Sequence, residues 1–103
     1  MSIRLIDPNA EIKIDVSGTT FMTKPLDAGQ IITLTRANQK LIDEGGTEHF
    51  EAVIKIIEPS IMSVDLPGGL TPDLFQRMYL TDFMDLIVKI INASSVSEDE
   101  SKN

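Results

Sequence analysis

The sequence has few side chains whose type and spacing could carry out catalysis. His49 is the single histidine, and it has Glu48 and Glu51 as its acidic neighbours. A zinc site needs further ligands at fixed spacing, such as a second histidine four residues away on the same helix. Because no such ligands are present, we interpret His49 as a surface histidine and predict no metal site and no catalytic base at this position.

Two pairs of acidic residues are the other candidates for chemistry. Catalysis by paired carboxylates requires one group to be removed from water and both to face a cleft. Asp43 and Glu44 fall instead at the end of a predicted helix. Asp82 and Asp85 fall on the polar face of another predicted helix. Solvated acids are expected at both places, so the sequence predicts a protein that is not an enzyme.

The glycine pairs and the lack of cysteine narrow the chemistry further. Gly45-Gly46 and Gly68-Gly69 belong to neither a phosphate-binding loop nor a dinucleotide-binding fingerprint, so both pairs predict turns. The chain contains no cysteine, which excludes disulfides, thiol catalysis and cysteine-ligated metals. We therefore expect no cofactor.

The charge balance limits the partners that this chain can bind. Sixteen acidic and nine basic residues give a formal net charge of −7, and the basic residues are scattered. Nucleic acid is not expected as a direct partner, because phosphate binding needs clustered Lys or Arg. No apolar run approaches the length of a membrane span, and the first residues lack the apolar core of a signal peptide. We expect a cytoplasmic protein that contacts no membrane.

Alternating residues near the N-terminus predict a β-hairpin. Residues 11–16 alternate between charged and apolar side chains, which is typical of a half-buried strand. Ser17-Gly18 is a turn signal, and residues 19–24 have the β-branched and aromatic character of a second strand. Residues 2–6 offer a third short strand, with a loose arm as the alternative.

Residues 27–42 fit two structures. Asp27 and Gln30 have the spacing of a capping box, which favours a helix from about Ala28. A short strand over residues 30–35 is the alternative, because Ile and Thr are frequent there and Gly29 weakens a helix start. The helical interpretation places five residues on the inward face: Ile31, Leu34, Asn38, Leu41 and Ile42.

Three further helices are predicted after the glycine pair at 45–46. Thr47 is expected to cap a helix over residues 48–58, which Pro59 ends and an irregular or extended link over 60–65 follows. Thr71-Pro72-Asp73 has the composition of a helix start and introduces a short helix. A final helix is predicted over residues 81–92.

These elements predict one α+β domain over residues 1–93, in which an N-terminal β-hairpin is followed by three to four α-helices. Residues 94–103 are polar and acidic and predict a disordered tail. The final helix is apolar nearly all round, which indicates either a core helix or a helix that meets a partner. If it meets a partner, the contact face is expected to comprise four residues: Phe83, Leu86, Ile87 and Ile90.

Four features follow one another along the chain: a hairpin around TTFMTKPL, the helix HFEAVIKII after a Gly-Gly break, the block LTPDLFQRMYLTDFMDLIVKII and the polar ending SEDESKN. This order of features resembles the tail assembly chaperones of long-tailed bacteriophages and related prophages. It covers most of the chain as a pattern of hydrophobic spacing rather than as an invariant signature. No binding residue of that family can be assigned to a position here.

The resemblance implies a non-enzymatic protein that binds the tape measure protein, and in some members the tail tube protein, during tail morphogenesis. It also implies a longer form made by ribosomal frameshifting in many members. Two other functions stay open on the sequence: a structural tail or head-completion protein, and an acidic inhibitor or antitoxin-like binding protein. Self-association through the apolar helices, giving a homo-oligomer, is a further expectation.

Overall fold

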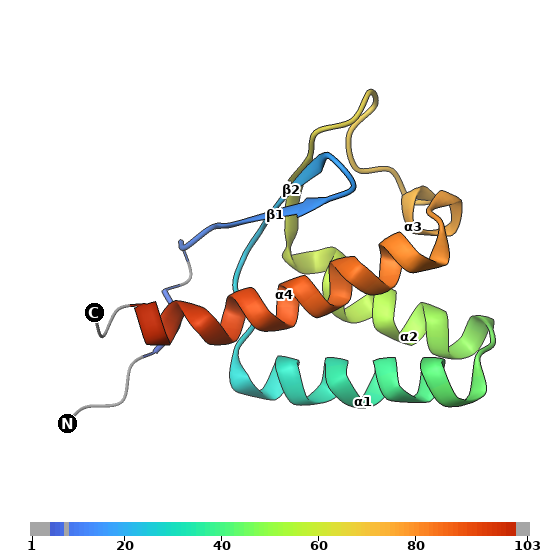
Figure 1. The fold of residues 1–103 in the computed structure, drawn as a ribbon, viewed down its shortest axis with the longest axis horizontal. Helices are drawn as coiled ribbons and strands as arrows, with labels where there is room; N and C mark the ends of the chain where they lie inside the picture. The colour runs from blue at the N-terminus through green and yellow to red at the C-terminus, as the bar shows by residue number, and fades with distance from the viewer. Residues whose placement is uncertain (1–4, 8, 101–103) are drawn as a thin grey trace.

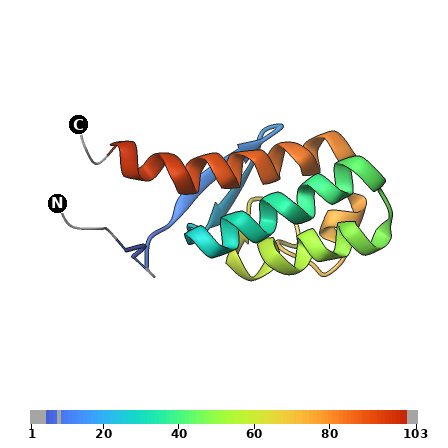
Figure 2. The ribbon, with the colours of Figure 1, turned by 90° about the horizontal axis from the view of Figure 1, so that it is seen from below.

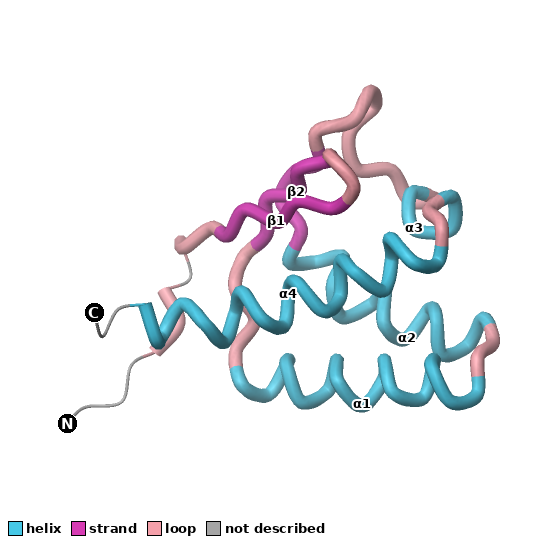
Figure 3. Tube along the Cα trace, viewed as in Figure 1, coloured by secondary structure: helices cyan, strands magenta, loops and turns pink. Residues whose placement is uncertain are grey.

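The computed structural model describes residues 5–7 and 9–100, with the side chains of 96–100 left out. Figure 1 shows a small sheet on one side of the molecule and α1 on the other, with α2 and α4 between them. Helix makes up most of the trace, as Figure 3 shows. The elements in chain order are β1 (Ile12–Val16), β2 (Thr19–Thr23), α1 (Ala28–Glu44), α2 (Thr47–Ile57), a 3-10 turn (Glu58–Ser60), β3 (Ile61–Val64), α3 (Leu74–Arg77) and α4 (Leu80–Glu100).

The predicted α+β fold and its hairpin are confirmed. β1 and β2 pair antiparallel around a two-residue turn in which Ser17 and Gly18 both have positive φ, 48° and 84°. Such turns match the twist of the flanking strands, and glycine accepts positive φ without strain. The third strand is β3, which pairs antiparallel with β2 and lies in the predicted link over 60–65. Of the segment expected to supply a strand, Leu5 and Ile6 are irregular and 2–4 lie outside the described residues.

The ambiguous segment is a helix, as favoured from its capping box. The Gln30 backbone N–H donates to Asp27 Oδ1 at 2.8 Å, and the Asp27 N–H donates to Gln30 Oε1 at 2.9 Å. Leu34, Asn38 and Leu41 are buried, as predicted. Ile42 was expected to face inward but is exposed, because it lies at the edge of this face, near the end of the helix.

The start of α2 differs from the prediction. Thr47 is the first helical residue, and the capping position is Gly46, which has φ +94° and offers no side-chain hydrogen bond. The positive φ of Gly45 and Gly46 explains why two glycines occur at this turn. The sharp turn between α1 and α2 requires a backbone conformation that glycine tolerates best.

The core lies between the sheet and the helices. Phe83 of α4 is at its centre, with its ring 4.7 Å from that of Phe50 and 6.0 Å from that of Phe75. Figure 2 shows α1 between α4 and α2 when the molecule is seen from below. α4 runs antiparallel to α1. One side of α4 contacts α1, and another side of α4 contacts β1.

The last helix extends further than predicted. It was expected to end at Asn92, and α4 continues to Glu100. Ser94 is only 3% exposed, and its hydroxyl oxygen accepts a hydrogen bond of 3.0 Å from the Leu26 backbone N–H. This contact joins α4 to the start of α1. The end of the predicted tail, 101–103, lies outside the described residues.

Replacing Ser94 by alanine tests this contact. Ser94→Ala leaves the buried Leu26 N–H without its acceptor, so the free energy of unfolding should fall by about 1–3 kcal/mol in urea titrations. The control is Ser95→Ala, because Ser95 is exposed and its hydroxyl donates only to Ile91 O of its own helix. Equal stability of the two variants would show that the contact at Ser94 does not support the fold.

Candidate functional site

The side chains considered for catalysis do not assemble into a site. His49 Nε2 lies 3.3 Å from Glu44 Oε1, so the histidine joins the end of α1 to the start of α2. Asp43 and Glu44 are exposed at the end of α1. Within the part of the chain that the structure describes, no three His, Cys, Asp or Glu residues gather in a metal-binding group.

Asp73 has a perturbed pKa, and its cause is local. The Thr71 hydroxyl donates to its carboxylate at 2.8 Å and Arg77 lies 3.3 Å away, and together they hold the pKa of Asp73 below its usual range despite some desolvation. A lowered pKa keeps this carboxylate ionised near neutral pH, so it is unsuited to act as a general acid. Its role is to fix the turn before α3.

The four residues predicted to meet a partner are core residues in this structure. Phe83, Leu86, Ile87 and Ile90 are all fully buried, so in this conformation a partner cannot reach them. They occupy the side of α4 that faces the other helices and the inner face of the sheet. In the isolated chain this side of the helix belongs to the core, and a partner-binding role for these four residues stays a prediction.

Polar side chains of α4 contact the hairpin while they remain partly exposed to solvent. The Ser17 hydroxyl donates to Asp82 Oδ1 at 2.7 Å, and Lys89 Nζ donates to the Asp15 carbonyl at 2.6 Å. Lys89 also pairs with Asp85 at 2.9 Å. A further side of the helix is apolar and partly exposed, since Leu80 and Val88 are 60% and 47% exposed.

We define the α1–α4 stripe as the uncharged side chains that the two antiparallel helices present along their shared groove. Helical spacing and the pockets at the two ends of this groove assign ten residues to it: Ala28, Ile31, Ile32, Thr35 and Ile42 from α1, and Leu80, Met84, Val88, Ile91 and Ser95 from α4. Four of them have large exposed fractions: Ile32 54%, Ile42 58%, Leu80 60% and Val88 47%. Exposed apolar side chains that form a contiguous surface usually mark a contact with another macromolecule.

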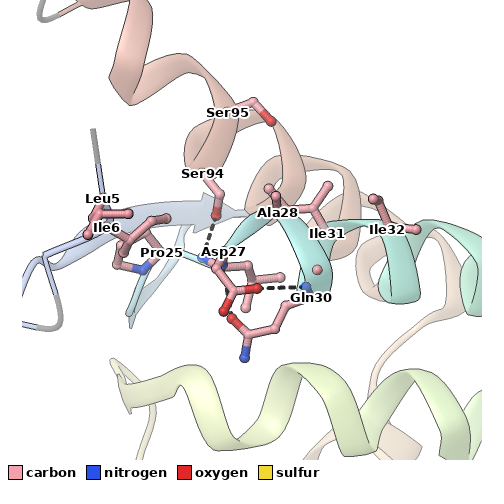
Figure 4. Close-up of a pocket in the computed structure, with 12 residues that line it drawn as sticks. Leu5, Ile6, Pro25, Asp27, Ala28, Gln30, Ile31, Ile32, Ser94 and Ser95 are labelled. Carbon is pink, nitrogen blue, oxygen red and sulfur yellow. Dashed lines mark hydrogen bonds between the residues drawn. The ribbon is translucent and has the colours of Figure 1, made fainter. Parts of the chain in front are cut away.

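The groove is hollowed at both ends. The arm pocket, of about 880 Å³, lies where α1 begins and α4 passes Ser94, and the N-terminal segment contributes Leu5 and Ile6 to its wall. Figure 4 shows these side chains around the capping box of α1. The corner pocket, of about 570 Å³, lies at the other end between the α1–α2 turn and the start of α4. Leu41 and Met84 are among the residues that line it.

Sequence reasoning missed this stripe because it took the polar side of the final helix as the solvent side. The signal was nevertheless present: Leu80, Met84, Val88 and Ile91 recur at intervals of three and four residues. That spacing defines a second apolar side beside the core side, and a helix with both is typical of one that is buried or partnered on most sides.

Comparison with known protein families, curated proteins and solved structures found no match. Over the described residues, no helix has the length and apolar character needed to cross a membrane.

Substitutions at two adjacent residues of α4, Ile87 and Val88, test which side of the helix is core and which is surface. Ile87→Asp buries an unpaired charge in the core and should cost more than about 4 kcal/mol, enough to unfold a small domain. Val88→Asp places the same charge on the exposed stripe and should change stability by less than about 1 kcal/mol. Circular dichroism with thermal melting measures both. Unfolding of Val88→Asp would contradict the assignment of this side as surface.

Proposed function

We propose that this protein is a non-enzymatic binding protein that holds an apolar segment of a client protein against the α1–α4 stripe. The observation that carries the proposal is a mainly apolar groove, hollowed at both ends, on a chain whose net charge is −7. Asp27 and Gln30 are the polar side chains of the capping box in the wall of the arm pocket. Two antiparallel helices with an apolar seam provide the surface into which an amphipathic helix packs its own apolar side.

The size of the stripe indicates a moderate affinity. Fully burying a large aliphatic side chain contributes about 1.5–3 kcal/mol, so four that are half exposed offer on the order of 4 kcal/mol beyond their present burial. Part of this free energy is offset by the loss of motion on association. Contacts of this strength favour a client that is held and later released, as an assembly chaperone requires.

The resemblance to tail assembly chaperones suggests which protein is the client. On that basis the protein binds the tape measure protein, and in the second place the tail tube protein, in the cytoplasm of a bacterium that carries the phage or prophage. The stripe supports this proposal because a holding protein must expose apolar surface while staying soluble. The acidic side chains on the remaining surface provide that solubility.

Co-expression with a tape measure protein encoded beside this chain tests the proposal. Wild type should keep the client in the soluble fraction and elute with it from a sizing column. A double variant, Ile42→Asp with Val88→Asp, should fold and lose most of the soluble client, because two charges enter the apolar stripe. The control is Met62→Asp, since Met62 is similarly exposed, at 46%, but lies on β3.

Three results would contradict this function. Equal rescue of the client by the folded double variant would show that the stripe is not the binding surface. Recovery of this chain in purified phage particles, with no soluble complex, would identify a structural virion component instead. A tight complex with a basic protein unrelated to phage tails would favour the inhibitor function.

A further inference from the structure

β1 is an edge strand of the sheet, and within the described chain only one of its sides is paired with another strand. The Thr20 carbonyl accepts from the Asp65 N–H at 2.8 Å, which turns the backbone of Thr20 toward β3. Backbone direction alternates along a strand, so Met22, two residues on, faces β3 as well. The partners of Thr20 and Met22 on β1 are Asp15 and Lys13. These two residues therefore direct their N–H and C=O groups away from β2.

Lys89 of α4 occupies the outward carbonyl at one end of this edge. Its Nζ donates to the Asp15 carbonyl at 2.6 Å, which agrees with the direction inferred from the strand pairing. The Lys13 groups differ, since within the described chain no hydrogen bond joins the Lys13 N–H or C=O to another segment. Unpaired backbone groups at a sheet edge are a template for another extended chain. The open section of the edge therefore centres on Lys13.

A hollow of about 410 Å³, which we call the edge groove, lies beside this section. β1 contributes Lys13, Ile14 and Asp15 to its wall, and α4 contributes Lys89, Asn92 and Ala93. Figure 1 shows that α4 runs on past the sheet, so its C-terminal half accompanies the open edge. A groove between an edge strand and a helix has the form that β-strand addition requires: the strand offers backbone hydrogen bonds, and the helix offers contacts for side chains.

The side chains of β1 define the composition of a matching strand. Glu11, Lys13 and Asp15 are exposed, while Ile12 and Ile14 are half-buried and buried. Among the described residues, no ion pair engages Glu11 or Lys13. Side chains directly opposite each other on antiparallel strands interact, and opposite charges stabilise the pair. A matching strand therefore has an acid opposite Lys13, a base at each alternate position beside it, and apolar residues between them.

We propose that the edge groove binds an extended segment of a partner protein, which adds to β1 as a further antiparallel strand. The segment alternates apolar and charged residues, with an acid opposite Lys13 and bases opposite Glu11 and Asp15. Backbone hydrogen bonds to Lys13 supply affinity, and the alternating charges fix the register. The edge groove shares no residue with the α1–α4 stripe, so this inference does not rest on the proposed function.

A second copy of this chain is a poorer occupant than a single extended segment. α4 lies against β1. If two β1 strands paired about a two-fold axis, the two α4 helices would follow strands about 4.8 Å apart, whereas the axes of packed helices need about 8–10 Å. The pairing would therefore bring the two helices too close together. A partner segment without a helix beneath it avoids this conflict.

The test uses synthetic peptides of about nine residues, titrated into the full chain labelled with ¹⁵N. The parent peptide has lysine, valine, glutamate, valine and lysine at its centre. One variant peptide carries an N-methyl group on the glutamate, whose N–H faces β1 in antiparallel addition, and a matched variant carries it on a valine, whose N–H faces away. A third peptide exchanges lysine and glutamate throughout. The measurement is hydrogen exchange of the Lys13 amide, with the Ile14 amide, already directed at β2, as the internal control.

We expect the parent peptide at saturation to slow exchange of the Lys13 amide at least about tenfold and to leave that of Ile14 unchanged. Methylation of the glutamate nitrogen should weaken binding at least about tenfold, because it removes a donor to the Lys13 carbonyl and blocks close approach. Methylation of the valine nitrogen should change the affinity by less than about threefold. The charge-exchanged peptide should bind about fivefold more weakly than the parent.

A matched pair of variants tests the charge pattern. Lys13→Glu places an acid opposite the glutamate of the parent peptide, so it should weaken that peptide about fivefold and strengthen the charge-exchanged one. Lys55→Glu makes the same change of charge at an exposed position on α2 and should leave both affinities unchanged within about twofold. Both lysines are exposed, so both variants should fold.

Four outcomes would overturn the inference. Three are a Lys13 amide that the parent peptide leaves unprotected, equal binding of the two N-methylated peptides, and equal effects of Lys13→Glu and Lys55→Glu. The fourth is protection of Lys13 that rises with protein concentration in the absence of peptide, which would identify a second copy as the occupant. The stripe variant, Ile42→Asp with Val88→Asp, should bind the parent peptide as wild type does, so failure of the proposed function is distinguishable from failure here.

Discussion

The rotation of α4 about its own axis is the constraint on which the rest of the structure depends. Hydrogen bonds from Lys89 to the Asp15 carbonyl and from Ser17 to Asp82 tie one side of this helix to the hairpin. Side chains on an α-helix have fixed angular positions, so this attachment also sets every other side. It directs Phe83 and its buried neighbours into the core and leaves Val88 facing outward.

The same constraint accounts for the surface that we propose as functional. Polar side chains of α4 bind the hairpin at the surface, where Lys89 donates to the Asp15 carbonyl at the edge of β1. An exposed Val88 contributes little to the stability of the isolated chain, and an apolar stripe reduces solubility. A partner that covers the stripe removes its apolar side chains from water. This is the physical basis for assigning the α1–α4 stripe to binding.

Local patterns predicted much of the fold because their causes are local. The capping box of Asp27 and Gln30 involves residues three apart, and the hairpin depends on a turn at Ser17-Gly18 and on alternation beside it. β3 was harder to predict, because residues 61–64 become a strand only by pairing with β2, which lies far earlier in the chain. The burial of Ser94 was similarly hard to predict, because its hydroxyl accepts a hydrogen bond from Leu26, 68 residues away.

The sequence by itself determined the class of the fold, most of its helices, the acidic charge and the presence of more apolar helical surface than an ordinary amphipathic helix carries. The tertiary structure decided which part of that surface is core. Phe83, Leu86, Ile87 and Ile90 were equivalent in pattern to Met84, Val88 and Ile91, since helical periodicity gives the spacing of apolar residues and not their direction. Direction is set by contacts between distant segments, here between α4 and β1 and between α4 and the start of α1.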